Sequence, residues 1–258
     1  MRIALLQLDL AWEDPPENRA RALRRLEEAA ARGARLAILP EMFATGYSMR
    51  AEEIAEPEEG PTESFLREAA ARLGLFVLAG VAQKAEPLPE NRVLLARPDG
   101  SVERIAKLHP FTFAGEEKVF GAGDRVATFD VEGIRVTPLV CYDLRFPEPF
   151  RMAAERTHLF AVVANWPERR RAHWSTLLVA RAIENLAYVA GVNRVGEGNG
   201  LVYTGDSTLF SPWGETLLSA AGQEALLVGD VRAEEVSSAR ERFPALSDRR
   251  PGAYRLTP

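Results

Sequence analysis

Short apolar stretches alternate with amphipathic ones along the first third of the chain. Apolar runs of strand length favour buried strands, and apolar residues spaced three and four apart favour helices. The pattern predicts a strand over 2–10, a helix opened by Asp14 and ended by Gly33, a strand over 35–40, a helix capped by Thr62 and ended by Gly74, and a strand over 75–82.

Hairpins enter the pattern in the middle of the chain. Asp99-Gly100 predicts the turn of a hairpin between 91–97 and 101–107. The further expected elements are a strand pair within 124–141, a short helix over 148–156, a strand over 159–165, a helix over 172–185, strands over 188–195, 207–210, 215–218 and 225–231, and a weak helix from Glu234 with an irregular tail from about 243. No repeat or linker interrupts this order. We therefore predict one α/β domain over 1–258, with a mixed sheet or two sheets covered by helices.

Composition excludes several classes of protein. Acidic residues outnumber basic ones by 37 to 32, so the chain lacks the basic excess of a dedicated nucleic-acid binder. The single Cys141 allows no intrachain disulfide, and one cysteine with three histidines does not favour a structural zinc site. The first residues do not read as a signal peptide, and the longest apolar run, 159–164, is far shorter than the ~18 residues of a membrane span. We expect a cytoplasmic protein that uses no metal or cofactor and binds neither nucleic acid nor membrane.

Cys141 is a candidate nucleophile because of its place between a strand and a helix. It follows the apolar run 134–140 and precedes Tyr142-Asp143-Leu144-Arg145. A side chain on such a sharp turn is presented where backbone N–H groups can face an oxyanion, and nearby positive potential favours the reactive thiolate. The alternative interpretation is a buried structural cysteine at a strand end.

A nucleophilic cysteine usually needs a base. His109, His158 and His173 are the histidine candidates, but none is accompanied by an orienting Asn or Asp at a strand end. A papain-like arrangement is therefore disfavoured.

Glu41 and Lys107 offer a better pair. Glu41 ends a buried strand, where poor solvation can raise a carboxyl pKa toward that of a general base. Lys107 also ends a strand, in a chain with 3 lysines among its 32 basic residues, and a cation there could stabilise a developing oxyanion. The alternatives are a structural ion pair for Glu41 and a surface position for Lys107. Glu, Lys and Cys together at three strand ends are far more specific than each alone.

These residues carry a resemblance to the nitrilase, or carbon–nitrogen hydrolase, superfamily that covers nearly the whole chain. The matching signatures are Leu39-Pro40-Glu41 with Gly46-Tyr47, Lys107-Leu108-His109, and Cys141-Tyr142-Asp143-Leu144-Arg145-Phe146-Pro147-Glu148. The resemblance implies that Glu41 is the general base, Lys107 the stabilising cation and Cys141 the nucleophile. It implies a second glutamate at Glu116, with Glu117 as the fallback. The implied fold is a four-layer α-β-β-α sandwich, paired into at least a homodimer.

Within the superfamily the chain is most similar to ω-amidases, which release ammonia from 2-oxoglutaramate and 2-oxosuccinamate. The stretches behind this likeness are 164–167, 173–174, 180–185, 188–194 and 205–207. The likeness implies a small carboxylate-bearing amide as substrate and a thioester on Cys141, with the tetrahedral oxygen held by Lys107 and the backbone N–H of Tyr142.

A substrate carboxylate calls for an arginine, which binds it through paired hydrogen bonds. Arg145 and Arg170 are the candidates, and Trp166 is expected to wall the pocket. The alternatives are an Arg145–Glu148 ion pair, a solvated Arg170 and a core position for Trp166. Three other functions stay open: an amidase acting on N-carbamoyl compounds or deaminated glutathione, a true nitrilase, and a non-catalytic interaction protein on the same scaffold.

Overall fold

Two β-sheets lie face to face in the computed structural model, which describes residues 1–254. The strand order is β13-β1-β2-β3-β4-β5 in the first sheet and β10-β11-β9-β8-β7-β6 in the second, where β12 also pairs with β11. The first sheet consists of β1 (Arg2–Gln7), β2 (Leu36–Ile38), β3 (Phe76–Gln83), β4 (Glu90–Ala96), β5 (Val102–Ala106) and β13 (Ala225–Asp230). The second consists of β6 (Phe129–Val131), β7 (Ile134–Val140), β8 (Leu159–Ala164), β9 (Tyr188–Asn193), β10 (Val195–Gly198), β11 (Leu201–Phe210) and β12 (Thr216–Ala221).

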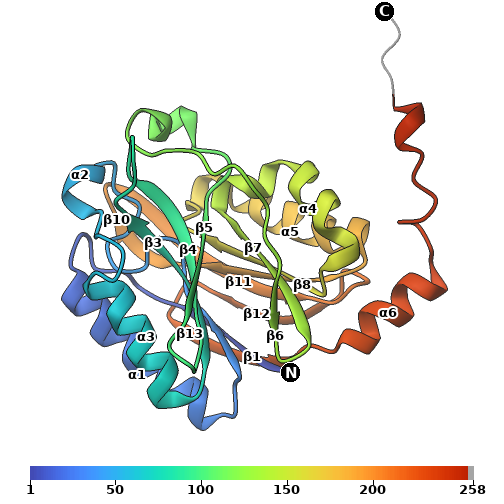
Figure 1. Ribbon diagram of the computed structural model, residues 1–258, viewed down its shortest axis with the longest axis horizontal. Helices are drawn as coiled ribbons and strands as arrows, with labels where there is room; N and C mark the ends of the chain where they lie inside the picture. The colour runs from blue at the N-terminus through green and yellow to red at the C-terminus, as the bar shows by residue number, and fades with distance from the viewer. Residues whose placement is uncertain (255–258) are drawn as a thin grey trace, which may run out of the picture.

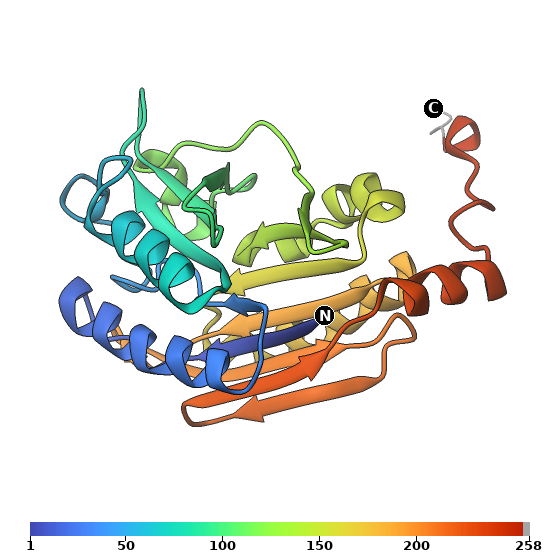
Figure 2. The ribbon, with the colours of Figure 1, turned by 60° about the horizontal axis from the view of Figure 1, so that its bottom comes forward.

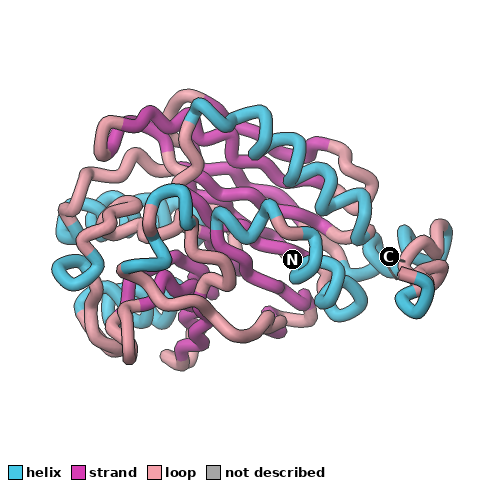
Figure 3. The backbone as a smooth tube through the Cα atoms, turned by 90° about the horizontal axis from the view of Figure 1, so that it is seen from above, coloured by secondary structure: helices cyan, strands magenta, loops and turns pink. Residues whose placement is uncertain are grey.

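Helices cover the outer face of each sheet (Figures 1 and 3). The helices α1 (Pro15–Ala31) and α3 (Pro61–Leu73) cover the first sheet, and α4 (Pro147–Ala153) and α5 (Arg171–Asn185) cover the second. The short α2 (Ala51–Ile54) lies near one end, and α6 (Ala233–Arg242) follows β13. Figure 2 shows α6 and the segment after it extending away from the sandwich.

The two-residue periodicity of the strands produces the layers. In β1, Ile3 and Leu5 belong to the core between the sheets, whereas Leu6 packs on the α1 and α3 side. In β8, Ala161 faces the core between the sheets, and Val162 belongs to the cluster that includes α5. The predicted four-layer α-β-β-α sandwich in a single domain is confirmed.

Two local predictions are wrong. Thr62 does not cap α3, because the helix begins one residue earlier at Pro61, and the Thr62 hydroxyl donates to Glu56 instead. The predicted strand 188–195 is divided into β9 and β10, and the predicted strand 207–210 is the end of the longer β11. Glycines interrupt the apolar alternation in this part of the chain, which hid the β10–β11 hairpin.

Two predicted segments are shorter than expected. The strand pair within 124–141 is confined to β6 and β7, and the first strand ends at Gln7 rather than residue 10. No helix within residues 1–254 combines the length and the apolar character needed to cross a membrane.

Candidate active site

Three of the four candidate catalytic residues follow strands of the two facing sheets. Glu41 lies just beyond β2, and Lys107 directly follows β5 of the same sheet. Cys141 directly follows β7 of the opposite sheet. Apolar packing between the sheets therefore fixes how far the glutamate and lysine lie from the sulfur.

Close packing of β3 against the segment after β2 holds Glu41 in place. The backbone N–H of Gly80 donates to Pro40 at 3.1 Å, and the Gly80 carbonyl accepts from Phe43 at 3.0 Å. A Cβ atom at Gly80 would stand 2.4 Å from the Glu41 Cα atom. Glycine is needed at residue 80 because any larger side chain would displace the Glu41 backbone.

Lys107 forms a buried ion pair with two carboxylates. Its Nζ atom lies 3.0 Å from Glu41 Oε1 and 2.8 Å from Glu116 Oε2, and all three side chains are at most 1% exposed. Burial alone would lower the pKa of Lys107, but the charges of Glu116 and Glu41 outweigh it and raise this pKa well above its usual value. Burial opposes ionisation of Glu116 as well, yet Lys107 outweighs it and lowers the Glu116 pKa. The lysine is therefore a permanent cation in this site.

Hydrogen bonds occupy most of the acceptor positions of Glu41. Oε1 accepts from Lys107 at 3.0 Å and from Asn91 Nδ2 at 2.8 Å, and Oε2 accepts from the backbone N–H of Asn165 at 2.9 Å. A carboxylate has about four acceptor positions. The position left on Oε2 is the one available for a proton from another group.

Cys141 has a backbone conformation that is uncommon for a residue other than glycine. Its φ angle is 44°, in the left-handed region, and it begins the 3-10 helix η3 (Cys141–Arg145). Asp143 stabilises this turn, since its carboxylate accepts from the N–H groups of Val140 at 3.0 Å and of His109 at 2.9 Å. Burial, and then the nearby charge of Glu41, raise the pKa of the Cys141 thiol well above its usual value. The thiol therefore needs a base to remove its proton.

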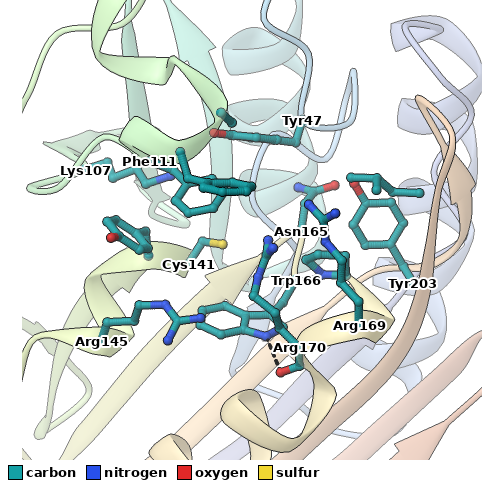
Figure 4. Close-up of a pocket in the computed structure, with 15 residues that line it drawn as sticks. Tyr47, Lys107, Phe111, Cys141, Arg145, Asn165, Trp166, Arg169, Arg170 and Tyr203 are labelled. Atoms are coloured by element: carbon teal, nitrogen blue, oxygen red, sulfur yellow. Dashed lines mark hydrogen bonds between the residues drawn. The ribbon is translucent and has the colours of Figure 1, made fainter.

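A cavity of about 170 Å³ lies in front of the sulfur, smaller than the roughly 300–1,000 Å³ of pockets for drug-sized ligands. Figure 4 shows the Cys141 sulfur pointing into it, with Lys107 and Tyr47 on one side and Trp166 and Arg170 on another. The lining residues are Tyr47, Lys107, Phe111, Phe113, Ala114, Cys141, Tyr142, Arg145, Asn165, Trp166, Pro167, Arg169, Arg170, Leu201 and Tyr203.

Three arginines line this cavity without a carboxylate partner. Within residues 1–254, Arg145, Arg169 and Arg170 form no ion pair, whereas most other arginines of the chain do. Arg170 lies 5.1 Å from the ring centre of Phe111, and burial followed by the charge of Arg169 lowers its pKa. These guanidinium groups give the cavity the charge needed to bind an anion.

Comparison with known proteins identifies the family. The sequence model of the family described as carbon-nitrogen hydrolase matches residues 2–241. The chain is 41% identical over 250 residues to "Omega-amidase YafV" of Yersinia enterocolitica, covering 96% of both chains. This chain belongs to the carbon–nitrogen hydrolase family.

Two further relatives of this carbon–nitrogen hydrolase agree with the assignment. A "2-oxoglutaramate amidase" of Bacillus subtilis is 30% identical over 256 residues, covering 98% of both chains. The crystal structure of XC1258 from Xanthomonas campestris, a CN-hydrolase superfamily protein with an arsenic adduct in its active site, superposes with a TM-score of 0.93 at 39% identity, covering 100% of this chain and 99% of that one. The expected resemblance to the nitrilase superfamily is confirmed.

The histidines of this hydrolase have other partners than Cys141. His109 Nδ1 lies 2.8 Å from Asp143, His158 accepts from the backbone of Arg135, and His173 accepts from Arg145 at 3.1 Å. No hydrogen bond between a histidine and Cys141 is found within residues 1–254. A papain-like base is therefore not seen.

The structure also separates the alternatives for Glu116 and Arg145. Glu116 is buried against Lys107, whereas Glu117 is exposed. The alternative Arg145–Glu148 ion pair is not present; Arg145 lies 5.0 Å from the ring centre of Trp166 and binds His173 instead. Trp166 is 3% exposed and lines the cavity, so its two interpretations are compatible. Within residues 1–254 no group of three or more His, Cys, Asp or Glu side chains is arranged to hold a metal ion.

Several side chains of the site were not predicted. Tyr203 lies on β11, in the hairpin that the sequence pattern hid, and it lines the cavity. Tyr47 belongs to the Glu41 signature, but its contact was not predicted: its hydroxyl donates to Glu116 Oε2 at 2.9 Å. Asn91 lies in a strand that was predicted, and a polar residue at the start of an apolar run was the one available signal.

Proposed function

We propose that this carbon–nitrogen hydrolase is an amidase of the ω-amidase type, which releases ammonia from a small primary amide that carries a carboxylate, such as 2-oxoglutaramate or 2-oxosuccinamate. The observation that carries the proposal is the buried Glu41–Lys107–Glu116 cluster beside Cys141, in a small cavity lined by three arginines that have no carboxylate partner. The names of the relatives from Yersinia enterocolitica and Bacillus subtilis support this substrate class.

In the first half of the reaction the Cys141 sulfur forms a bond to the amide carbon and Glu41 takes the thiol proton. The negative oxygen of the tetrahedral intermediate is held by Lys107 and by the backbone N–H of Tyr142, which lies in the first turn of η3 and has no partner within that helix. Glu41 then gives its proton to the nitrogen, the C–N bond breaks, and ammonia leaves a thioester on Cys141.

In the second half water cleaves the thioester. Glu41 takes a proton from the water, whose oxygen bonds to the acyl carbon, and the C–S bond breaks to release the acid. The proton on Glu41 returns to the sulfur. Glu116 touches Lys107 through both of its oxygens, at 3.1 and 2.8 Å, and keeps the ammonium group aimed at the cavity.

Ammonia release across a substrate panel tests the proposed function. The panel contains 2-oxoglutaramate, 2-oxosuccinamate, glutamine, an N-carbamoyl amino acid and a simple nitrile. We expect turnover of the two keto-acid amides far above that of the others. Preferred turnover of the N-carbamoyl compound or the nitrile would overturn the substrate class.

Arg170→Ala is expected to weaken binding of the keto-acid amide. Loss of a hydrogen bond to a charged group costs about 1.5–3 kcal/mol, so KM for 2-oxoglutaramate should rise by about tenfold to a hundredfold with a smaller change in kcat. The matched control is Arg171→Ala, because Arg171 pairs with Asp206 and does not line the cavity. An unchanged KM in the Arg170 variant would show that another arginine binds the carboxylate.

We also propose that the enzyme is a homodimer in the cytoplasm. Support for association comes from large apolar side chains left exposed, including Ile183 (52%), Trp213 (44%) and Phe243 (56%). The reaction needs a free thiol, which a reducing compartment preserves. Light scattering after gel filtration measures the assembly: a mass of twice 28.5 kDa supports it, and 28.5 kDa contradicts it.

A further inference from the structure

Asn91 occupies an unusual position for an amide. It lies on β4, where Val93 and Leu95 on the same strand face belong to the apolar core between the sheets. Asn91 is itself 0% exposed. Its backbone carbonyl accepts from the N–H of Lys107 at 2.8 Å. The main chain of Asn91 is thus bonded to the main chain of Lys107, which leaves the Asn91 side chain available for other contacts.

The side chain of Asn91 joins the two carboxylates that Lys107 also joins. Its Nδ2 atom donates to Glu41 Oε1 at 2.8 Å and to Glu116 Oε1 at 3.1 Å. Lys107 Nζ lies 3.0 Å from the same Glu41 oxygen and 3.1 Å from the same Glu116 oxygen. Two donors and two acceptors therefore alternate around a closed ring.

The orientation of the amide is fixed by this ring. A flipped Asn91 would place its oxygen against two carboxylate oxygens, so Nδ2 must face them. The Oδ1 atom has no hydrogen-bond partner among residues 1–254. Leaving a buried acceptor unpaired is unfavourable for folding. Asn91 keeps its hydrogen bonds to the two carboxylates in spite of this cost. This indicates that the residue serves the active site rather than the stability of the fold.

We propose that Asn91 is a positioning residue that holds the Oε1 atoms of Glu41 and Glu116 and leaves the open acceptor position of Glu41 Oε2 to exchange a proton with Cys141. The proposal rests on the proposed function of Glu41 as the base. Asn91 donates to both carboxylates without adding a second positive charge beside Lys107. The titratable groups around this ring are Glu41, Lys107, Glu116, Tyr47, Cys141 and Tyr203.

Replacement of Asn91 by an apolar side chain of similar size tests the role. Donors to a carboxylate favour its charged form, so their loss raises the pH needed to ionise the base. In Asn91→Leu we expect kcat/KM to fall by about tenfold to a hundredfold and the acidic limb of its pH profile to move up by about one pH unit. KM at the optimum should change little, because Asn91 does not line the cavity.

Asn91→Asp gives the opposite pH dependence. An aspartate between two glutamates resists ionisation, so at low pH its protonated form can donate one of the missing hydrogen bonds. At higher pH it ionises and adds a third negative charge beside Lys107. We therefore expect the activity of Asn91→Asp to decline with rising pH in a range where the wild-type enzyme is fully active. Loss of core packing alone would not move the two variants in opposite directions.

Gln83→Leu is the matched control. Gln83 is also 0% exposed on the first sheet, and its Nε2 atom donates to Glu63 at 2.8 Å, away from the cavity. We expect a wild-type pH profile for this variant. Wild-type pH profiles in both Asn91 variants, or the same shift in Gln83→Leu, would overturn the proposal. An inactive wild-type enzyme on every amide would count against the proposed function instead, so the two failures are distinguishable.

Discussion

Cys141→Ala is expected to lose all measurable amide hydrolysis. Without the sulfur no thioester can form, and removal of a nucleophile has cost on the order of 10⁶ in kcat in a well-studied hydrolase. The fold should persist, because alanine can retain the apolar contacts that the partly buried Cβ makes at the end of β7. Ammonia release from 2-oxoglutaramate and the mass of the intact protein after brief exposure to substrate measure the effect.

Two observations separate the loss of the nucleophile from a loss of structure. Circular dichroism and the thermal midpoint should match those of the wild-type enzyme. Wild-type protein quenched during turnover should carry one acyl group, and the alanine variant should carry none. Ammonia release at the wild-type rate by Cys141→Ala would exclude the thioester mechanism.

Glu41→Gln is expected to lower turnover while it raises the rate at which the Cys141 thiol is alkylated. Loss of a general base costs about 10²–10⁴ in rate, so kcat/KM should fall by that factor. The charge of Glu41 is one cause of the raised pKa of Cys141, so a neutral glutamine should lower that pKa and increase the thiolate fraction at alkaline pH. Alkylation of Cys141 should therefore become faster in a variant that hardly turns over substrate.

The two effects are measured on one preparation, by steady-state ammonia release and by the rate of iodoacetamide labelling from pH 7 to 10. Glu117→Gln is the control, because Glu117 is exposed and does not contact Lys107. A Glu41 variant with slower alkylation and normal turnover would assign the base to another residue.

Much of the site was predictable because three of its reacting residues lie at the ends of predicted strands. Glu41 and Cys141 each follow a buried apolar strand, and Lys107 follows the shorter β5, which mixes apolar and charged residues. Functional residues are often placed just beyond such rigid elements. Glu116 was predicted from the resemblance alone. Its 3-10 helix η2 (Glu116–Lys118) has no apolar periodicity that would predict an element.

The rest depends on packing that sequence patterns do not encode. The contact of Asn91 with two carboxylates requires β4 to lie beside β3 and β5 in a particular register. Tyr203 reaches the cavity through a hairpin with glycines at 196, 198 and 200, which look like a loop in the sequence. The pairing of Arg145 with His173 joins residues 28 positions apart in the chain, and no local rule favours it over Glu148.

The division of the reacting groups between two sheets has a consequence for mutations far from the cavity. A displacement of about 1 Å between reacting atoms can reduce a rate about a hundredfold. Val93 of the first sheet and Val163 of the second both belong to the core between the sheets, and neither lines the cavity. A change of side-chain volume at such a position alters the gap between base and nucleophile. Core substitutions between the sheets are therefore expected to lower the catalytic rate even where they do not unfold the chain.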